Sequence, residues 1–443
     1  MNAAERLRGT LTILRALPGQ RRIPFLPAEE VAGLRDARLR ETVRYAAETV
    51  PYYRDLFARE GIDPREIRSA GDLARLPVID KRVLYEDPGC FRSLSPAGRD
   101  AVAFRTSGFS TGFPLDVFHD RRSLLANIAF SERERAVEVA LVGRRVRYVG
   151  AELMYTPAAT HRVQSFYKTA SFRPLRPRLH EVPIETSVER VAARLNELRP
   201  DVIRSYGTYL ETFFRIVAAR DIPLHTPKAI VYGGDRMTSE GRAFVESRFH
   251  VPVLSRYNAV EAFKIGFFCE AREGFHLHED LCHVDVAGSE GRPVSPGEPG
   301  QVVISNLVNR GTVLLNYRLG DLARITSERC SCGRTSRRLL ELDGRITDVI
   351  RLPSGDVVHQ FALWGAVKLV GGVIRYQLVQ HEPARFELRL MTVDRATYEQ
   401  VAHDIARRVR DILQGAEVEV AHRELLELEP YGKFKPIVPL AST

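Results

Sequence analysis

The chain has 443 residues, with 65 Lys and Arg against 56 Asp and Glu, a formal charge of +9, and 44% hydrophobic residues. This length suffices for two or three domains with a sizeable core, and the composition excludes a chain that is disordered, collagen-like or coiled coil throughout. Only seven basic residues are Lys and 58 are Arg, scattered along the chain among acidic residues. Because a nucleic-acid binder concentrates positive charge in runs or on one face, we expect no nucleic-acid partner.

The cysteines and the apolar runs bear on the compartment. The five cysteines are too few and too unevenly spaced for a disulfide framework. No run approaches the roughly 18 apolar residues of a membrane span, and Arg15 interrupts the short apolar stretch 11–17. The sequence therefore predicts a protein of the reducing cytoplasm with no membrane partner.

In chain order, helices come first. Apolar residues recur at helical spacing from Val31 to Val50, Pro51 stops that pattern, and a second short helix is expected to end near Gly61. From about residue 140, short β-rich runs alternate with helical stretches. The predicted strands are 146–149, 202–205, 229–232 and 251–254, and the predicted helices are 187–198, 208–220 and 238–248. This alternation is typical of an α/β fold with a mostly parallel sheet.

Strand-like segments then follow one another without helices. Those at 283–287, 301–306 and 313–317 indicate a smaller antiparallel or barrel-like subdomain. After Gly344 the pattern restarts, with strands near 373–380, 385–392 and 416–421 and a helix at 394–414. We therefore predict a large N-terminal α/β domain over 1–343 and a small, mobile α+β domain over 344–443.

The segment 105–115, Arg-Thr-Ser-Gly-Phe-Ser-Thr-Gly-Phe-Pro-Leu, is the most informative. Two glycines among hydroxyl side chains supply a turn with exposed backbone N–H groups that can surround phosphate oxygens. It is not a Walker A loop, because no Gly-Lys-Ser/Thr follows. Alone, such a loop is more often an ordinary surface turn.

Segments further along the chain favour phosphate binding over an ordinary surface turn. Tyr232-Gly233-Gly234-Asp235 and Tyr257-Asn258-Ala259-Val260-Glu261 each follow a predicted strand, and Tyr317-Arg318-Leu319-Gly320-Asp321 follows another. The carboxyl ends of strands in open α/β sheets are where ligands bind. Gly344-Arg345-Ile346-Thr347-Asp348 opens the last domain, and Gly432-Lys433-Phe434-Lys435 lies near the C-terminus.

In this order, the segments resemble the core motifs of the adenylate-forming superfamily of acyl-CoA synthetases. Val50-Pro51-Tyr52-Tyr53-Arg54, Gly61-Ile62-Asp63-Pro64 and Leu76-Pro77-Val78-Ile79-Asp80-Lys81 narrow the resemblance to the phenylacetate–coenzyme A ligase branch, which includes CapK-like capsular-polysaccharide proteins. The resemblance covers nearly the whole chain, from about residue 40 to 438.

The resemblance implies a nucleotide site. The residues that would hold the β- and γ-phosphates of ATP are Thr106, Ser107, Gly108, Ser110, Thr111 and Gly112. Those that would border the adenine are Gly233, Gly234, Asp235, Tyr257 and Asn258. Asp321 would accept hydrogen bonds from the ribose, Arg345 would contact the sugar or phosphate, and Glu261 would bind Mg²⁺.

The resemblance also implies that Lys433 bridges the substrate carboxylate and the α-phosphate. These groups repel each other, so their approach needs a positive charge between them. Composition supports this independently, because two of the seven Lys stand at 433 and 435 in a chain that otherwise uses Arg. Lys is a compact point charge, whereas Arg presents a planar fork.

The pattern is not followed everywhere. Phe109 adds a residue to the phosphate loop, and Leu115 stands where many members of the superfamily have Lys. Asn258 replaces a Gly, and Val260 replaces a Thr whose hydroxyl would contact the α-phosphate. Glu261, Asp321 and Lys433 are nevertheless present, so we expect an active enzyme.

A second cluster points to zinc. Cys330 and Cys332 lie in one turn, and Cys269 precedes His276 in a second segment. Thiolates and an imidazole are usual ligands of a closed structural zinc site, and the resembling branch has such a cluster here. We predict Cys269, His276, Cys330 and Cys332 as ligands, with His278 or Cys282 as substitutes; buried cysteines without a metal are the alternative.

The function that follows is ATP-dependent activation of an aryl or other small carboxylic acid, ligated to CoA with release of AMP and pyrophosphate. An amine, a carrier-protein thiol or a sugar remains an alternative acceptor. A non-catalytic nucleotide- or nucleic-acid-binding protein is the alternative from another class. The resemblance also allows a homodimer as partner and a hinge near 344–348.

Overall fold

The computed structural model describes residues 2–106, 115–143, 148–154, 159–172, 178–345, 349–359, 362–363, 366–367, 370, 372–424, 426 and 434–440. Its centre is an eleven-stranded sheet in the order β10-β11-β12-β13-β9-β8-β7-β6-β5-β3-β4. Its strands are β3 Val149–Met154, β4 Arg178–Pro183, β5 Val202–Ser205, β6 Ala229–Gly233, β7 Val253–Tyr257, β8 Gly266–Phe268, β9 Phe275–Leu277, β10 Cys282–Ala287, β11 Gly300–Asn306, β12 Tyr317–Thr326 and β13 Arg338–Arg345.

The two halves of this sheet differ in direction. Strands β4, β3, β5, β6 and β7 are parallel neighbours. From β7 onward, through β8, β9, β13, β12, β11 and β10, neighbours are antiparallel. The predicted parallel sheet is therefore confirmed, and the predicted antiparallel part is hydrogen-bonded to its edge as one continuous sheet. The strand predicted at 313–317 is wrong, because β12 begins only at Tyr317.

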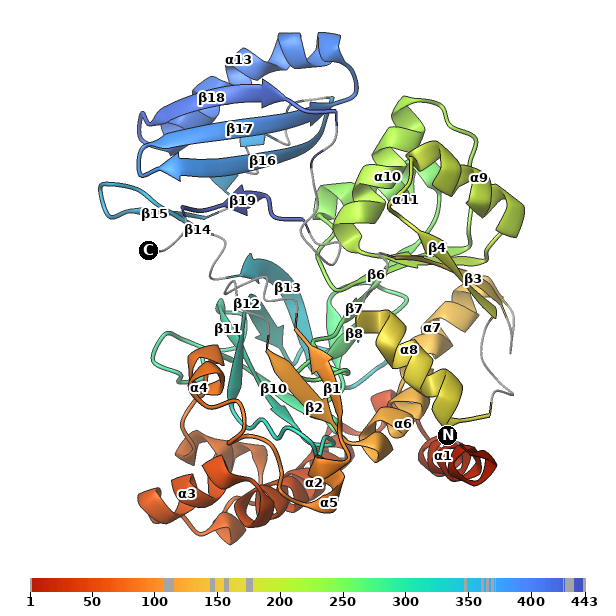
Figure 1. Cartoon of the computed structure of the whole chain (residues 1–443), viewed down its shortest axis with the longest axis vertical. Helices are drawn as coiled ribbons and strands as arrows, with labels where there is room; N and C mark the ends of the chain where they lie inside the picture. The colour runs from red at the N-terminus through yellow and green to blue at the C-terminus, as the bar shows by residue number, and fades with distance from the viewer. Residues whose placement is uncertain are drawn as a thin grey trace.

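Helices accompany both halves (Figure 1). The amino-terminal helices are α1 Ala3–Ala16, α2 Ala28–Thr49, α3 Pro51–Glu60, α4 Lys81–Glu86 and α5 Pro96–Arg99. The others of this part are α6 Arg121–Phe130, α7 Glu132–Val142, α8 Ala159–Ala170, α9 Val188–Leu198, α10 Gly207–Ala219 and α11 Ser239–Phe249. The break between α2 and α3 has the predicted cause, since Pro51 opens α3 and Gly61 ends it in a left-handed conformation.

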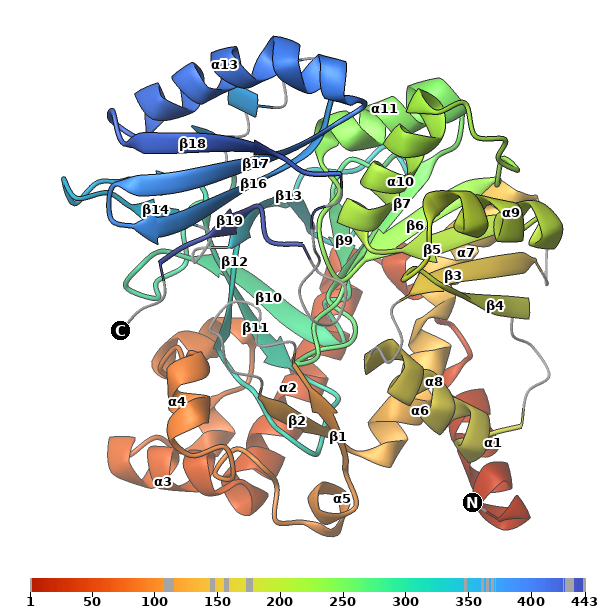
Figure 2. The same ribbon diagram turned by 45° about the horizontal axis from the view of Figure 1, so that its top comes forward.

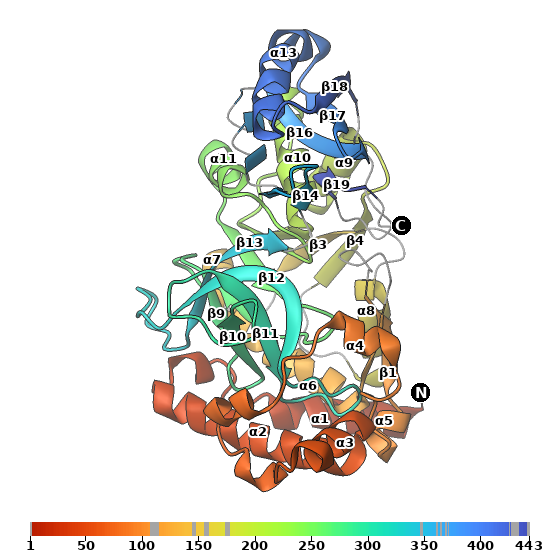
Figure 3. The ribbon, with the colours of Figure 1, turned by 90° about the vertical axis from the view of Figure 1, so that its left-hand side faces the viewer.

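The last hundred residues contain a second sheet. Its order is β18-β17-β16-β19, formed by β16 Val373–Glu382, β17 Arg385–Thr392, β18 Glu417–His422 and β19 Ile437–Val438. Helix α13, Arg395–Ile412, covers its outer face (Figure 3), and Asp394 caps the helix by accepting from Thr397 N at 2.7 Å. The hairpin β14 Val349–Arg351 and β15 Val357–His359 lies beside it. The boundary at 343/344 stays a prediction, and it falls within β13.

The cores of the two sheets are distinct. One apolar cluster joins α2 and α3 to the antiparallel strands, and another lies between α9, α10 and the parallel strands. A third fills the space between the C-terminal sheet and α13. Among the described helices, none is long and apolar enough to cross a membrane.

Candidate active site

The predicted adenine-side segments lie at the carboxyl ends of two adjacent parallel strands. Tyr232 is paired with Ser255 and Gly233 with Arg256, so β6 and β7 end side by side. Gly234 follows β6 with φ +82, a conformation that favours glycine, and a Cβ there would lie 3.4 Å from the Tyr206 ring. The topology thus brings Gly234 and Asp235 beside Tyr257 and Asn258, as the strand pattern predicts.

Asp235 is held by the start of α10. Its carboxylate accepts from Thr208 N at 3.3 Å, and the Thr208 hydroxyl also donates to it. The helix can come this close because residue 207 is glycine, where a Cβ would lie 2.3 Å from the backbone N of Met237. A negative charge at a helix N-terminus is favoured by the exposed N–H groups and the helix dipole.

The predicted ribose carboxylate joins the same place from the antiparallel half of the sheet. The Tyr257 hydroxyl donates to Asp321 Oδ2 at 2.6 Å, across 64 positions of sequence. Asp321 lies inside β12 and not after a strand, which differs from the sequence prediction. Its register partner in β13 is Arg345, of which only the backbone is described. The fold therefore unites Tyr257, Asp321 and Arg345 through strands that the sequence shows only as separate segments.

The stem of the predicted phosphate loop is a hairpin. Strands β1 Val102–Arg105 and β2 Asp116–His119 are antiparallel. At their loop end, Thr106 N donates to the carbonyl of Leu115 at 2.8 Å, and Leu115 N donates to the Thr106 hydroxyl at 2.8 Å. These two hydrogen bonds close the stem, with the Thr106 hydroxyl acting as an acceptor. The predicted phosphate-binding residues Ser107, Gly108, Ser110, Thr111 and Gly112 lie outside the described residues.

The hairpin is attached to the Tyr257–Glu261 segment. His119, at the end of β2, is buried and its Nε2 lies 2.7 Å from the carbonyl of Val260, which makes Nε2–H the donor. The His119 ring also stacks on Phe263 at 4.2 Å between centroids. Burial lowers the pKa of His119 to about 4, so the imidazole is neutral at pH 7. Sequence spacing did not show this contact, since the partners are 141 positions apart.

Glu261, the predicted Mg²⁺ ligand, is buried at 5% exposure. Its backbone carbonyl accepts from Asn306 Nδ2 at 2.9 Å, which fixes the segment to the end of β11. Burial raises the pKa of the neighbouring Tyr317, and the Glu261 charge raises it further. Mg²⁺ is commonly held by one or two carboxylates together with substrate phosphates and water. A single buried carboxylate on a segment fixed to β11 suits that mode.

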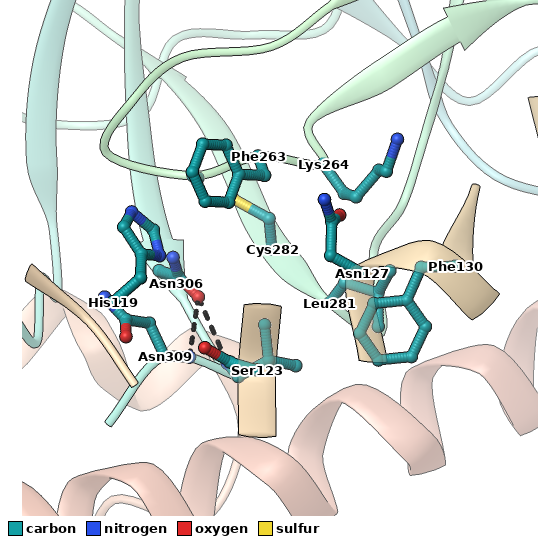
Figure 4. A pocket seen from close by; sticks show the side chains of 12 residues that line it. His119, Ser123, Asn127, Phe130, Phe263, Lys264, Leu281, Cys282, Asn306 and Asn309 are labelled. Atoms are coloured by element: carbon teal, nitrogen blue, oxygen red, sulfur yellow. Dashed lines mark hydrogen bonds between the residues drawn. The ribbon is translucent and has the colours of Figure 1, made fainter. Parts of the chain in front are cut away.

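A small cavity lies behind this segment (Figure 4). It measures about 20 Å³, and its lining includes His119 beside Asn306 and Asn309, with Phe263 and Lys264 above them in the view. A cavity of this size holds about one water molecule. It is therefore not the acid pocket. Two aromatic rings near this segment are engaged in packing, since Phe263 stacks on His119 and Phe268 packs against Phe275.

A buried ionic cluster, formed by Glu134 and Glu138 of α7 with Arg204, Arg256 and Lys264, supports the end of β7. Lys264 Nζ lies 2.9 Å from both Glu134 oxygens, and Arg204 lies 2.6 Å from Glu138. Arg256, the residue before Tyr257, pairs with both glutamates. Sequence reasoning missed this cluster, because its partners are 66 to 130 positions apart.

The predicted zinc ligands converge. The ligand atoms of Cys269, His276, Cys330 and Cys332 lie within 4.8 Å of one another. Cys269 Sγ is 3.7 Å from Cys330 Sγ, and Cys332 Sγ is 3.3 Å from His276 Nε2. Zn–S bonds of about 2.3 Å in a tetrahedron place sulfur atoms about 3.8 Å apart, so the four residues fit this metal.

The residues around this cluster also fit a zinc site. His276 Nδ1 lies 3.2 Å from the Ser336 hydroxyl, which leaves Nε2 facing the thiols. Arg334 N donates to Cys332 Sγ at 3.4 Å. The predicted substitutes are elsewhere, since His278 Nε2 faces Glu134 at 3.2 Å and Cys282 lines the small cavity.

Comparisons with known proteins agree with this geometry. No family model matches the chain. It is 26% identical over 341 residues to the phenylacetate-coenzyme A ligase of Thermus thermophilus, covering 75% of this chain and 74% of that protein. To the Escherichia coli phenylacetate-coenzyme A ligase it is 24% identical, with coverage of 73% and 72%. A solved structure of 2-hydroxyisobutyryl-CoA ligase with R3-HIB-AMP superposes with a TM-score of 0.73 at 19% identity, over 95% of this chain and 91% of that one.

The chain resembles the phenylacetate–coenzyme A ligases in sequence and the adenylate-forming ligases in fold. Solved states of 2-hydroxyisobutyryl-CoA ligase differ in their match. The postadenylation state gives the TM-score of 0.73, and the thioesterification state, which contains 2-HIB-AMP and CoA, gives 0.62. The chain as a whole therefore superposes better on the postadenylation state than on the thioesterification state.

Asn258, which departs from the ligase pattern, stabilises the turn that carries Glu261. Asn258 stands where the adenylate-forming pattern has Gly, and with its amide assigned so that the nitrogen faces the neighbouring acceptors, it donates to the carbonyls of Phe263 at 2.6 Å and Tyr257 at 2.9 Å. Hydrogen bonds from Asn258 thus close the turn that carries Glu261. The Asn in this chain adds a local brace to the segment.

Proposed function

We propose that this chain activates a carboxylic acid with ATP, forming an acyl-adenylate and pyrophosphate, and then transfers the acyl group to the thiol of CoA with release of AMP. The observation that carries the proposal is the convergence of Asp235, Tyr257, Glu261 and Asp321 beside the stem of the Thr106 hairpin. The similarity to phenylacetate-coenzyme A ligases over three quarters of the chain supports it. An aryl or other small acid is the substrate class.

Each predicted residue has a role in this reaction. Asp321 receives the ribose hydroxyls, and Arg345 contacts the sugar or phosphate. Gly233, Gly234, Asp235, Tyr257 and Asn258 border the adenine. Glu261 binds Mg²⁺, which supplies positive charge to the phosphates during pyrophosphate departure. The hydroxyls and N–H groups of the 106–112 loop hold the β- and γ-phosphates.

Lys433, which lies outside the described residues, bridges the acid carboxylate and the α-phosphate. Its positive charge reduces the repulsion between these two anions during the in-line attack. The C-terminal domain, proposed to span 344–443, presents Lys433 for adenylation and a different face for thioester formation. The Cys269, His276, Cys330 and Cys332 cluster would hold a zinc ion with a structural role.

Acid-dependent ATP–pyrophosphate exchange tests the proposal, across a panel of aryl and short aliphatic acids beginning with phenylacetate. We expect exchange with one class of acid, and a decrease of about 100-fold or more in Lys433→Ala. Lys435→Ala is the matched control and retains exchange. If no acid supports exchange and Lys433→Ala changes nothing, the proposal is wrong.

Two further readouts separate the alternatives. Mixing the acyl-adenylate with CoA should give a thioester, and its absence alongside normal exchange would indicate an amine, carrier-protein or sugar acceptor. Salt-dependent retention on DNA by a protein without ATP affinity would instead favour the non-catalytic alternative.

A further inference from the structure

The C-terminal sheet touches the N-terminal part of the chain at helix α10 (Figure 2). A small apolar cluster forms this contact. Ile216 comes from α10, Ile374 from β16, Met391 from β17, and Leu426 and Phe434 from the segments after β18. All five side chains are buried. The two units are thus in contact through a few apolar residues, and one charged residue lies among them.

That residue is Arg375, which is buried at 8% exposure on β16. The pairing of β16 with β17 shifts register between Val373 and Arg375. A bulge of this kind re-aims side chains, so the adjacent Ile374 and Arg375 can both contact the N-terminal part. The guanidinium donates to the backbone carbonyl of Thr208 at the start of α10. It also lies 4.3 Å above the ring of Phe434.

On the N-terminal side, the acceptor belongs to the candidate nucleotide site. Thr208 is the residue whose N–H and hydroxyl hold the Asp235 carboxylate. Burial lowers the pKa of Arg375 to about 10, while the charges of Glu211 and Asp235 act in the opposite direction. Arg375 therefore remains charged at neutral pH, and the Thr208 carbonyl, the Phe434 ring and the charges of Glu211 and Asp235 compensate in part for its loss of water.

On the C-terminal side, β16 fixes the segment that follows Lys433 in the sequence. Leu378 N donates to the carbonyl of Pro436 at 2.8 Å, and Gln377 Nε2 donates to the carbonyl of Lys435 at 3.0 Å. Strand β19 then runs parallel to β16. Phe434, which directly follows Lys433, is held between this strand segment and the Arg375 guanidinium.

A buried cation restricts how two surfaces can meet. Its loss of water is compensated only where acceptors and opposite charges are aligned with it, so every other register is penalised. We propose that Arg375 is a positioning residue that sets the register in which the C-terminal unit docks on α10, and thereby favours adenylation over thioester formation. This inference rests on the proposed function, since it divides the two steps of that reaction.

The test compares the two half-reactions in Arg375→Glu and Arg375→Lys. Glu introduces repulsion with Asp235 and Glu211, and Lys keeps the charge but loses the planar fork and the ring contact. The first readout is pyrophosphate exchange with the acid that the wild-type protein uses fastest. The second is thioester formation from the prepared adenylate of that acid and CoA. We expect exchange to decrease by about tenfold or more in Arg375→Glu and by about threefold in Arg375→Lys, with thioester formation unchanged or faster.

Arg385→Glu is the matched control, because Arg385 lies on the same sheet with its side chain 53% exposed and paired to Glu382. It should leave both half-reactions unchanged. An equal decrease in both steps, or no change in either, would overturn the positioning role. If Arg375→Glu does not fold, as judged by its melting transition, the comparison is decided by Arg375→Lys. Absence of exchange in the wild-type protein would instead overturn the proposed function, and this inference with it.

Discussion

Among the places where the described part of this chain buries positive charge, Arg256 and Arg375 differ in how the charge is compensated. Arg256, beneath the nucleotide side of the sheet, pairs directly with Glu134 and Glu138. Burial alone would lower the pKa of Arg256, but these carboxylates outweigh it and the pKa is raised. Arg375, between the two units, has a carbonyl and a ring as direct partners, and its pKa is lowered to about 10 by burial.

The difference distinguishes a fully paired core around Arg256 from an interface at Arg375 where the buried charge is only partly compensated. Where the carboxylates are in contact, removing either partner leaves an uncompensated charge in the interior. Where the compensation is incomplete, the charged group loses little by returning to water. The ionic cluster under β7 therefore holds the site together, whereas the contact at Arg375 is compatible with the docking role proposed for it.

The largest effect is expected in the ionic cluster. Glu138→Gln keeps the shape of the side chain but removes the charge that faces Arg204 and Arg256. The free energy of unfolding should decrease by about 3–5 kcal/mol, because Arg204 loses the carboxylate it contacts and Arg256 loses one of its two. Urea denaturation followed by fluorescence measures this. Glu197→Gln, which breaks an exposed pair with Arg194, should cost less than about 1 kcal/mol. Equal effects in the two variants would contradict the assignment of a fully paired core.

The stability that the same ionic cluster contributes should decrease at acidic pH. Burial raises the pKa of Glu138, but Arg204 and Arg256 lower it further, to about 2 in the folded protein. A carboxylate with a depressed folded pKa contributes stability above its unfolded pKa, near 4.5, and that contribution is lost as pH decreases toward 2. Unfolding measured between pH 7 and pH 2.5 should show a flat region above about pH 5 and a decrease below it. Glu138→Gln should show a shallower decrease, and an unchanged slope would count against this role.

In the Cys269, His276, Cys330 and Cys332 cluster, the charge of the thiolates would be compensated by a bound metal cation instead of by a protein side chain. Ser336→Ala removes the hydroxyl beside His276 Nδ1. Loss of such a partner typically reduces metal affinity by about 10- to 100-fold. Competition with a chromophoric chelator measures the zinc affinity of the purified protein. Ser247→Ala, an exposed serine bonded only within its own helix, is the control. A wild-type protein with less than stoichiometric zinc would contradict the metal assignment itself.

A smaller effect is expected at the nucleotide edge, which the ionic cluster supports. Tyr257→Phe removes the hydroxyl that donates to Asp321 at 2.6 Å. The Asp321 carboxylate then loses one orienting hydrogen bond, worth about 1 kcal/mol, so ATP affinity should decrease by about fivefold. Titration calorimetry with ATP measures this. Tyr398→Phe, whose hydroxyl donates to Val420 O at 3.0 Å in the C-terminal unit, should leave ATP affinity unchanged, and a matching loss there would indicate a general effect on folding.

The sequence alone was enough for the features that depend on local pattern. The strands β5 and β6 and the helices α9, α10 and α11 begin and end within one or two residues of their predicted bounds. The placement of Gly234 and Asn258 at strand ends followed from that alternation, because parallel strands present their carboxyl ends at one edge. The proximity of the Cys/His set was also predictable, since zinc ligands have a restricted chemistry.

Other features were decided only by the tertiary structure. The position of Asp321 inside β12 depends on pairing with β11 and β13, which no local pattern reveals. The contacts of Lys264 with Glu134 and of Arg375 with Thr208 join residues 130 and 167 positions apart. In the sequence these are ordinary charged residues, indistinguishable from those on a solvated surface. Only burial makes their partners matter, because the energetic value of a charge depends on how much water the fold removes from it.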